Sequence, residues 1–329
     1  MIIEGADLNN REKAMFALRA LYSSHGFSLY RMSKFEEFDL YARNRDFMDS
    51  APIITFTDTD GMLMALKPDV TLSIVKNNRH IGNNIRKIYY NENVYRVSPK
   101  THFFKEIMQV GLECLGQIDD ECICEVLLMA AESLQVLSDS AVLDISNLDI
   151  LSGIIAKCDV SREVEEEITG CIGEKNLHGL CKICTENNLS REQAELLKKL
   201  IKLYGEPKRV ISELEQVIAG FEDSLPEETQ AVFDESIRKL KMIVDAFEGS
   251  GFEDMLRIDF SVVSDLNYYN GIIFKGFVEG VPDGVLSGGQ YDKLMDNMNR
   301  NSRAIGFAVY MDYLGKLSKF DGEEVIIRG

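Results

Sequence analysis

The sequence contains no hydrophobic run of membrane-spanning length and no basic patch dense enough to hold nucleic acid. Its 36 lysines and arginines are outnumbered by 54 aspartates and glutamates, which gives a net charge of -18. Such a surface repels a phosphate backbone. The N-terminus, MIIEGADLNN, also lacks the basic start and apolar stretch of a secretion signal. These absences predict a globular cytoplasmic protein that binds neither nucleic acid nor membrane.

Cysteines are few and scattered. There are seven in a chain of 329 residues, which is long enough to bury a core without disulfides, so we expect reduced thiols. One cluster, Cys171, His178, Cys181 and Cys184, offers four possible ligands for tetrahedral zinc. The same segment also fits ordinary helical packing with buried thiols. We favour packing, and therefore predict no metal and no cofactor.

Hydrophobic periodicity predicts a sheet that is interrupted by a block of helices. Residues 10–24 have helical spacing, a second helix is expected from 120 to 138, and the pattern is helical throughout from about 160 to 248. The order of strands, then helices, then strands predicts an α+β domain with an antiparallel sheet. Strands are expected in a hairpin made by PIITF and MLMAL, at about 86–97, 105–116, 256–263 and 271–278, and within 303–318.

The strand EIMQVGLECLG carries an informative polar pattern. Period-2 alternation places Gln109, Gly111 and Glu113 on one face and four apolar residues on the other. Because Gly111 has no side chain, it leaves room above the sheet for a small ligand. The alternative is a solvated sheet face with a bulge at Gly111, and the strand taken alone favours that alternative.

Four further segments favour the ligand pocket over the solvated sheet face, because they occur in a familiar order: KPDVT (67–71), NVYR (93–96), LNYYNG (266–271) and SGGQYD (287–292). Together they resemble the class II aminoacyl-tRNA synthetase core of histidyl-tRNA synthetase. The resemblance implies a class II synthetase-like α+β fold, in which helices flank an antiparallel sheet. It divides the chain into a core at 1–150 and 250–318, a helical insertion at 151–249 and a C-terminal tail at 319–329, with no anticodon-binding domain.

The resemblance also implies a histidine pocket. Asp69, Thr71 and Gln109 would hold the ligand's ammonium group, Arg96 its carboxylate, and Glu113 with Tyr269 its imidazole. These donor and acceptor types match those groups. Tyr268 fits a core position equally well. The remaining predicted contacts are Tyr268 and Tyr291 as walls, and Gly111, Gly288 and Gly289 as pocket backbone.

Residues that the synthetase pattern uses for ATP are missing. Ser264 and Tyr313 stand where that pattern has arginines for the nucleotide, and Ser98 stands where it has a glutamate for adenine. One such charge is worth on the order of a thousandfold in phosphoryl transfer, so we expect no adenylation and no catalytic residues. Arg257 could compensate in principle, although an ion pair with Asp259 or another carboxylate is the commoner role.

A histidine pocket on a synthetase fold without these arginines resembles the regulatory subunits of ATP phosphoribosyltransferase, the first enzyme of histidine biosynthesis. The resemblance implies a dimer that assembles with a short-form catalytic subunit into a hetero-oligomer. It also implies that the dimer activates this subunit and mediates feedback by L-histidine. Two alternatives stay open: a synthetase-like enzyme that forms an aminoacyl adenylate for a non-tRNA acceptor, and an interaction scaffold that has lost its ligand.

Overall fold

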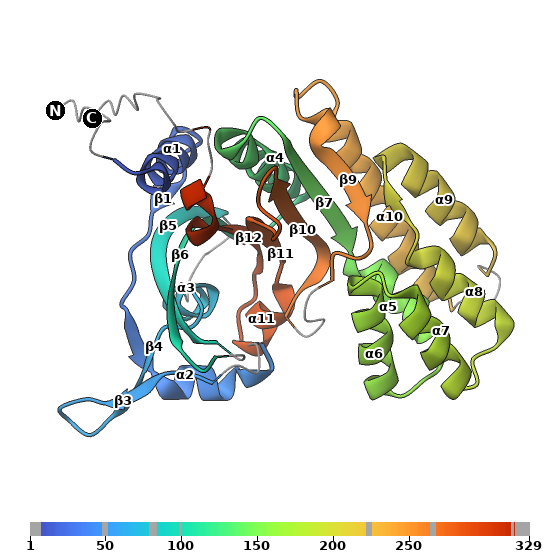
Figure 1. The fold of residues 1–329 in the computed structure, drawn as a ribbon, viewed down its shortest axis with the longest axis horizontal. Helices are drawn as coiled ribbons and strands as arrows, with labels where there is room; N and C mark the ends of the chain where they lie inside the picture. Colours follow the sequence, from blue (N-terminus) through green and yellow to red (C-terminus); the bar gives the residue numbers. More distant parts are fainter. Residues whose placement is uncertain are drawn as a thin grey trace. The chain divides into compact units, whose positions relative to one another are not determined.

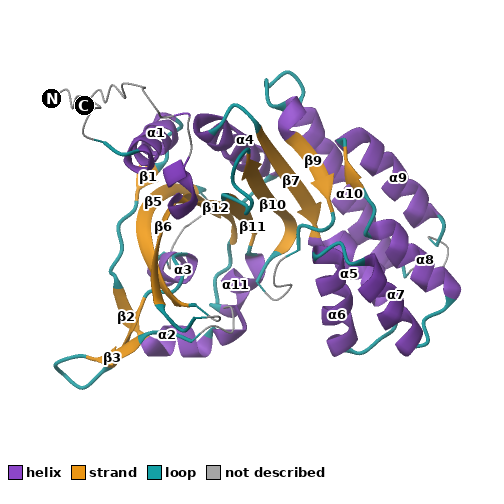
Figure 2. Ribbon diagram, in the orientation of Figure 1, coloured by secondary structure: helices purple, strands orange, loops and turns teal. Residues whose placement is uncertain are grey.

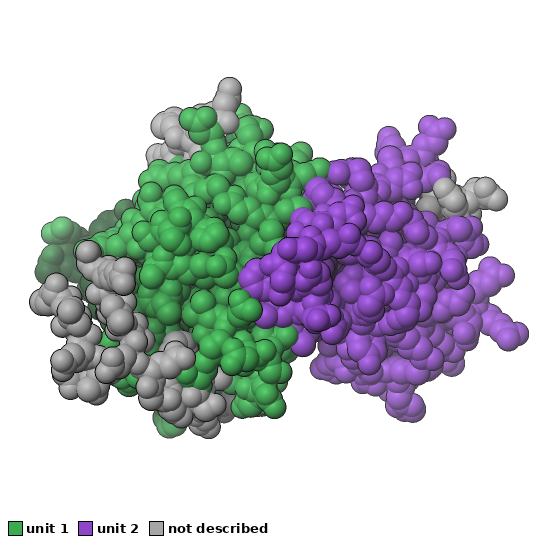
Figure 3. Space-filling view, turned by 90° about the horizontal axis from the view of Figure 1, so that it is seen from above, with its two compact units in different colours: residues 1–141, 276–329 green, residues 142–275 purple. Residues whose placement is uncertain are grey.

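The chain divides into two compact units, Met1–Ala141 with Gly276–Gly329, and Val142–Lys275 (Figures 1 and 3). A computed structural model describes residues 8–47, 52–78, 84–98, 101–221, 226–263, 268–316 and 319. The second unit is broader than the helical insertion predicted at 151–249, and the boundaries of that insertion stay a prediction. Most of the predicted tail, 319–329, lies outside the described residues.

A large, mostly antiparallel sheet forms the centre of the first unit. Its longest pair is β5 (Arg86–Val97) and β6 (Phe104–Gly116), which confirms the two strands predicted at 86–97 and 105–116. On the other side of β6 lie β12 (Arg303–Tyr310) and then β11 (Leu286–Gln290), both antiparallel to their neighbours. The predicted α+β class with an antiparallel sheet is confirmed.

Helices α1 (Asn10–Ser24) and α4 (Asp120–Leu137) pack on one face of this sheet (Figure 1). The buried ring of Tyr22 on α1 contacts Tyr89 and Phe307 edge-on, with ring centroids 6.1 and 6.0 Å apart. Its hydroxyl lies 3.1 Å from Ser133 Oγ on α4. Leu112 on β6 is paired with Tyr89 and Phe307 and so shares their helix-covered face. Because alternate strand residues point to opposite faces, Gln109, Gly111 and Glu113 lie on the other face.

A small second sheet of three strands lies in the N-terminal part of the first unit. Its strands are ordered β2-β4-β3, and the turn between β3 and β4 is held by Asp58 Oδ1, which accepts from the backbone N–H groups of Asp60 and Met62. Gly61 in this turn has a φ of +83°, which favours glycine. The hairpin predicted from PIITF and MLMAL is therefore confirmed. The elements here are β1 (Ser28–Leu29), β2 (Phe35–Glu37), α2 (Phe38–Arg43), η2 (Arg45–Phe47), β3 (Thr55–Thr57), β4 (Leu63–Leu66) and α3 (Thr71–Asn77).

Helices dominate the second unit, as the sequence pattern predicted (Figure 2). They accompany β7 (Ala141–Asn147) and β9 (Leu256–Asp259), which pair in parallel, while β8 (Tyr204–Gly205) is antiparallel to β9. The helices are α5 (Leu148–Ala156), α6 (Arg162–Gly173), α7 (Leu177–Glu186), α8 (Arg191–Leu200), α9 (Pro207–Ala219), α10 (Glu227–Phe247) and the short η4 (Glu253–Met255). The boundary between the units falls within β10 (Asn270–Val278); α11 (Asp292–Asn297) and η5 (Met311–Lys316) belong to the first unit.

The cysteine cluster considered for zinc lies on α6 and α7. All seven cysteines are free thiols. Among the residues that the structure describes, no three histidine, cysteine, aspartate or glutamate side chains come together as a metal site. The described helices also include none that is long and apolar enough to cross a bilayer.

Tyr22 and Ser133 give a test of the packing between α1 and α4. Tyr22→Phe should lower the free energy of unfolding by about 1 kcal/mol, because Ser133 keeps its second bond, to Met129 O. Ser133→Ala should cost more, about 2 kcal/mol, because it leaves the buried tyrosine hydroxyl without this partner. Urea denaturation of both variants measures the difference, and equal losses would contradict this account.

Candidate functional site

The polar face of β6 is buried. Gln109 is only 6% exposed and Glu113 only 2%. The register from Arg86–Leu115 to Val97–Phe104 is unbroken, as is the register between β6 and β12, so there is no bulge at Gly111. The alternative of a solvated, bulged strand is therefore wrong.

Glu113 is the best-enclosed acidic group of this face. Its Oε2 accepts a hydrogen bond from the hydroxyl of Tyr291 at 2.7 Å, and its Oε1 accepts a longer one from Thr71 Oγ1 at 3.4 Å. Burial raises its pKa to about 8, and the nearby negative charge of Asp69 adds to the rise. The two hydrogen bonds oppose this shift only in part. Enclosure of this carboxyl group therefore favours its protonated form.

Asp69 and Thr71 are placed by the start of α3. Asp69 Oδ1 accepts the backbone N–H of Leu72 at 2.9 Å, which satisfies one of the free donors at the helix N-terminus. Thr71 begins the helix and turns its hydroxyl toward Glu113. The structure thus brings together three of the predicted ligand contacts, Asp69, Thr71 and Glu113, with Tyr291 as the fourth member.

Gly111 lies beneath a side chain that sequence reasoning missed. A Cβ at Gly111 would meet Tyr90 Oη at 2.5 Å and Tyr90 Cζ at 2.7 Å. Tyr90 is the residue directly opposite on β5 and is almost fully buried. The room that Gly111 leaves above the sheet therefore holds the end of Tyr90, and the role of Gly111 in a ligand pocket stays a prediction.

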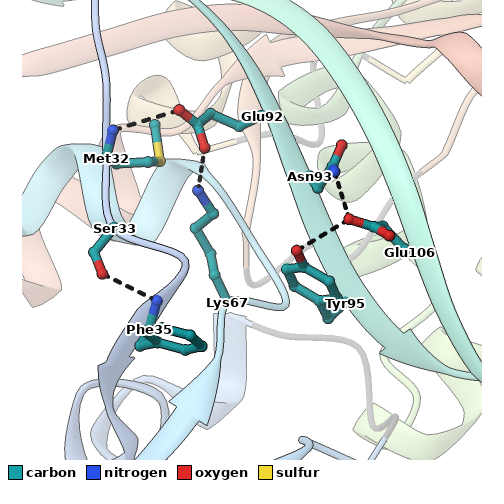
Figure 4. A network of polar contacts seen from close by, with 8 residues as sticks. All are labelled: Met32, Ser33, Phe35, Lys67, Glu92, Asn93, Tyr95 and Glu106. Carbon is teal, nitrogen blue, oxygen red and sulfur yellow. Dashed lines mark hydrogen bonds and ion pairs between the residues drawn. The ribbon is translucent and has the colours of Figure 1, made fainter.

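A buried ion pair fixes the strand that leads into KPDVT (Figure 4). Lys67 is 0% exposed, and its Nζ lies 2.9 Å from Glu92 Oε2, while Glu92 Oε1 accepts the N–H of Met32 at 3.4 Å. Lys67 O also accepts the N–H of Tyr95 at 2.9 Å. Burial lowers the pKa of Lys67, and Glu92 opposes that effect. Asp69 lies two residues after Lys67. The contacts of Lys67 with Glu92 and Tyr95 therefore help to position Asp69.

Arg96 lies on the same face, because the register pairs it with Lys105. Its Nε donates to Pro68 O at 3.1 Å, which holds the guanidinium against the backbone just before Asp69. A guanidinium is the group that suits the carboxylate of an amino acid. That role stays a prediction.

The other predicted contacts differ in where they lie. Gly289 is paired with Gly306, which is itself paired with Glu113, so Gly289 lies on the polar face. Gly288 is paired with Phe307 and lies on the helix-covered face. Tyr268 and Tyr269 belong to the second unit, where their rings touch with centroids 4.4 Å apart. Their contribution to the pocket stays a prediction.

Two of the positions that lack the expected synthetase residues are described. Ser98 closes the β5–β6 hairpin, since its N–H donates to Phe103 O and its hydroxyl accepts the N–H of Thr101. Tyr313 is 42% exposed and packs edge-on against Tyr310. Ser264 lies outside the described residues. Asp259 pairs with Lys175 at 2.6 Å rather than with Arg257.

The fold and this acidic, tyrosine-lined cluster define a class II synthetase-like protein. The model of the histidyl-tRNA synthetase family matches residues 4–314, and the chain belongs to that family. The fold is shared with solved structures. One is an ATP phosphoribosyltransferase regulatory subunit/histidyl-tRNA synthetase from Bacillus halodurans, at 20% identity and a TM-score of 0.81, covering 94% of this chain and 79% of that one.

Within the family, curated relatives confirm the resemblance to regulatory subunits. The ATP phosphoribosyltransferase regulatory subunit of Bacillus cereus (strain ATCC 10987 / NRS 248) is 28% identical over 307 residues, covering 91% of this chain and 70% of that protein. The ATP phosphoribosyl transferase (HisG:HisZ) complex from Thermotoga maritima contains a chain with a TM-score of 0.69 and 17% identity. That match covers 92% of this chain and 98% of the other.

The raised pKa of Glu113 predicts how stability depends on pH. Between its ordinary value and about 8, the folded state binds a proton that the unfolded state has lost, so stability should fall as pH rises through this window. Each pH unit in this window should lower the free energy of unfolding by up to about 1.4 kcal/mol. Glu113→Gln, which keeps the shape and cannot ionise, should flatten this part of the profile. Guanidinium denaturation from pH 5 to 9 measures it, and parallel profiles would contradict the assignment.

The Lys67–Glu92 pair predicts unequal effects of its two partners. Glu92→Gln leaves a fully buried ammonium without its counter-charge and should lower the free energy of unfolding by about 3 kcal/mol. Lys67→Met removes the buried charge. Glu92, which is 15% exposed and still accepts from Met32 N–H, keeps partial solvation, so this variant should cost less than half as much. Chemical denaturation of both variants at pH 7 decides this, and a larger loss for Lys67→Met would refute the burial argument.

Proposed function

We propose that this chain is a non-catalytic regulatory subunit of ATP phosphoribosyltransferase. It acts in the cytoplasm, forms a dimer, and joins a short-form catalytic subunit in a hetero-oligomer. It is needed for the activity of that subunit and binds L-histidine as a feedback effector. The curated relatives and the shared fold support the regulatory role; dimerisation and the effector are the finer part of the proposal.

The observation that carries the proposal is the acidic cluster formed by the buried Glu113 and the half-buried Asp69. Two carboxyl groups beside the hydroxyls of Thr71 and Tyr291 suit a ligand with an ammonium group and an imidazole. Arg96, whose Nε donates to Pro68 O, is suited to hold a ligand carboxylate.

Protonation of Glu113 adds a chemical reason for choosing histidine. A neutral carboxyl donates one hydrogen bond and an ionised one accepts, so Glu113 is able to meet either nitrogen of an imidazole. A ligand that brings positive charge into the pocket favours the ionised form of Glu113. Feedback further requires that histidine bind the active and inhibited assemblies with different affinity.

Titration calorimetry and reconstitution test the proposal together. L-histidine should bind the protein, alone or with a short-form ATP phosphoribosyltransferase catalytic chain, and that chain should become active only when this protein is added. Glu113→Ala should weaken histidine binding at least tenfold, because hydrogen bonds to charged groups contribute about 1.5–3 kcal/mol. Glu166→Ala, which removes an exposed glutamate on α6, is the matched control and should bind normally.

The same experiments separate the alternatives. Robust ATP–pyrophosphate exchange with histidine would show an adenylate-forming synthetase-like enzyme instead. Activation of the catalytic chain without any histidine binding would leave a partner-activating scaffold. If the protein neither activated the catalytic chain nor bound histidine, the proposal would be overturned.

A further inference from the structure

Two glycines lie between Glu113 and Tyr291 on the polar face of the sheet. The register places Glu113 on β6 opposite Gly306 on β12, and Gly306 opposite Gly289 on β11. Tyr291 follows directly after β11. The two glycines therefore form a lane without side chains that leads from Glu113 toward Tyr291.

The Glu113 side chain occupies this lane. A Cβ at Gly306 would overlap Glu113 Oε2 and lie 2.5 Å from Glu113 Cδ, so the carboxyl group rests directly on the glycine. From there Oε2 reaches the Tyr291 hydroxyl at 2.7 Å. One strand, β12, separates the two residues, and neighbouring strands lie about 4.8 Å apart. The bond thus forms only because the side chain crosses β12 unobstructed.

The position of this carboxyl group is restrained. It is held by Tyr291 and Thr71 at its two oxygens and is nearly inaccessible to solvent. A methyl group at position 306 would push it out of that place. The same methyl would also meet the backbone oxygen of Leu112 at 2.5 Å, a strain that does not involve Glu113. An informative experiment must separate these two effects.

We propose that Gly306 is a positioning residue for Glu113: its missing side chain lets the carboxyl group lie across β12 and bond Tyr291 in the geometry that recognises the ligand. The inference rests on the proposed histidine site. Gly306 would not touch histidine itself; it acts through the place and direction of the Glu113 oxygens. Gly289 extends the same lane on the next strand.

A double-mutant cycle with Gly306→Ala and Glu113→Ala tests the inference in the full-length chain. Gly306→Ala should weaken L-histidine binding at least tenfold in calorimetry. In the Glu113→Ala background the same substitution should cause little further loss, because no carboxyl group is left to displace. The Leu112 strain is common to both backgrounds and cancels in the cycle. Gly170→Ala, where an added Cβ meets open space, is the glycine-to-alanine control and should bind normally.

A second measurement does not need the ligand. Gly306→Ala should remove the loss of stability between pH 5 and pH 8, because the displaced carboxyl leaves its buried place beside Asp69 and Tyr291. An unchanged pH profile would overturn the inference even if histidine does not bind the parent protein. Equal losses of affinity in both backgrounds would assign Gly306 a purely structural role. Absence of binding by the parent would count against the proposed function alone.

Discussion

The hydrogen bond between Glu113 and Tyr291 is the constraint on which the polar face of the sheet depends. It links residues 178 positions apart in the chain and spans three neighbouring strands, because Glu113 on β6 reaches Tyr291 across β12. It also requires glycine at position 306. Since the carboxyl group is enclosed, the fold raises its pKa and so shifts the pH at which it ionises.

Part of this arrangement is readable from the sequence. The alternation of β6 is local, so it identified Gln109 and Glu113 as neighbours on one face, and the turn at Gly61 follows from the short spacing of its strands. The overlap of Tyr90 on Gly111 and of Glu113 on Gly306 was missed. Both depend on which strands are adjacent and in which register, and for β6 and β12 that register joins segments about 190 residues apart along the chain. The buried Lys67–Glu92 pair was missed for the same reason.

The family fold and the chemistry of the site are separate matters. A class II synthetase-like sheet provides the positions, while the side chains at them decide which ligand is tolerated. Here the cluster at the N-terminus of α3 is acidic, and Ser98 and Tyr313 serve a hairpin closure and an aromatic contact. The fold is therefore common to the family, while the side chains at these positions are particular to this chain.

Glu92 has a mechanical consequence that goes beyond the stability of its ion pair. Its two oxygens join the segment at Met32 to the side chain of Lys67, and the N–H of Lys67 in turn donates to Lys34 O (Figure 4). The extended N-terminal segment and the backbone ahead of Asp69 therefore form one linkage with a shared pivot on β5. Residues 32–34 are thus linked to the backbone ahead of Asp69 by contacts that involve no helix.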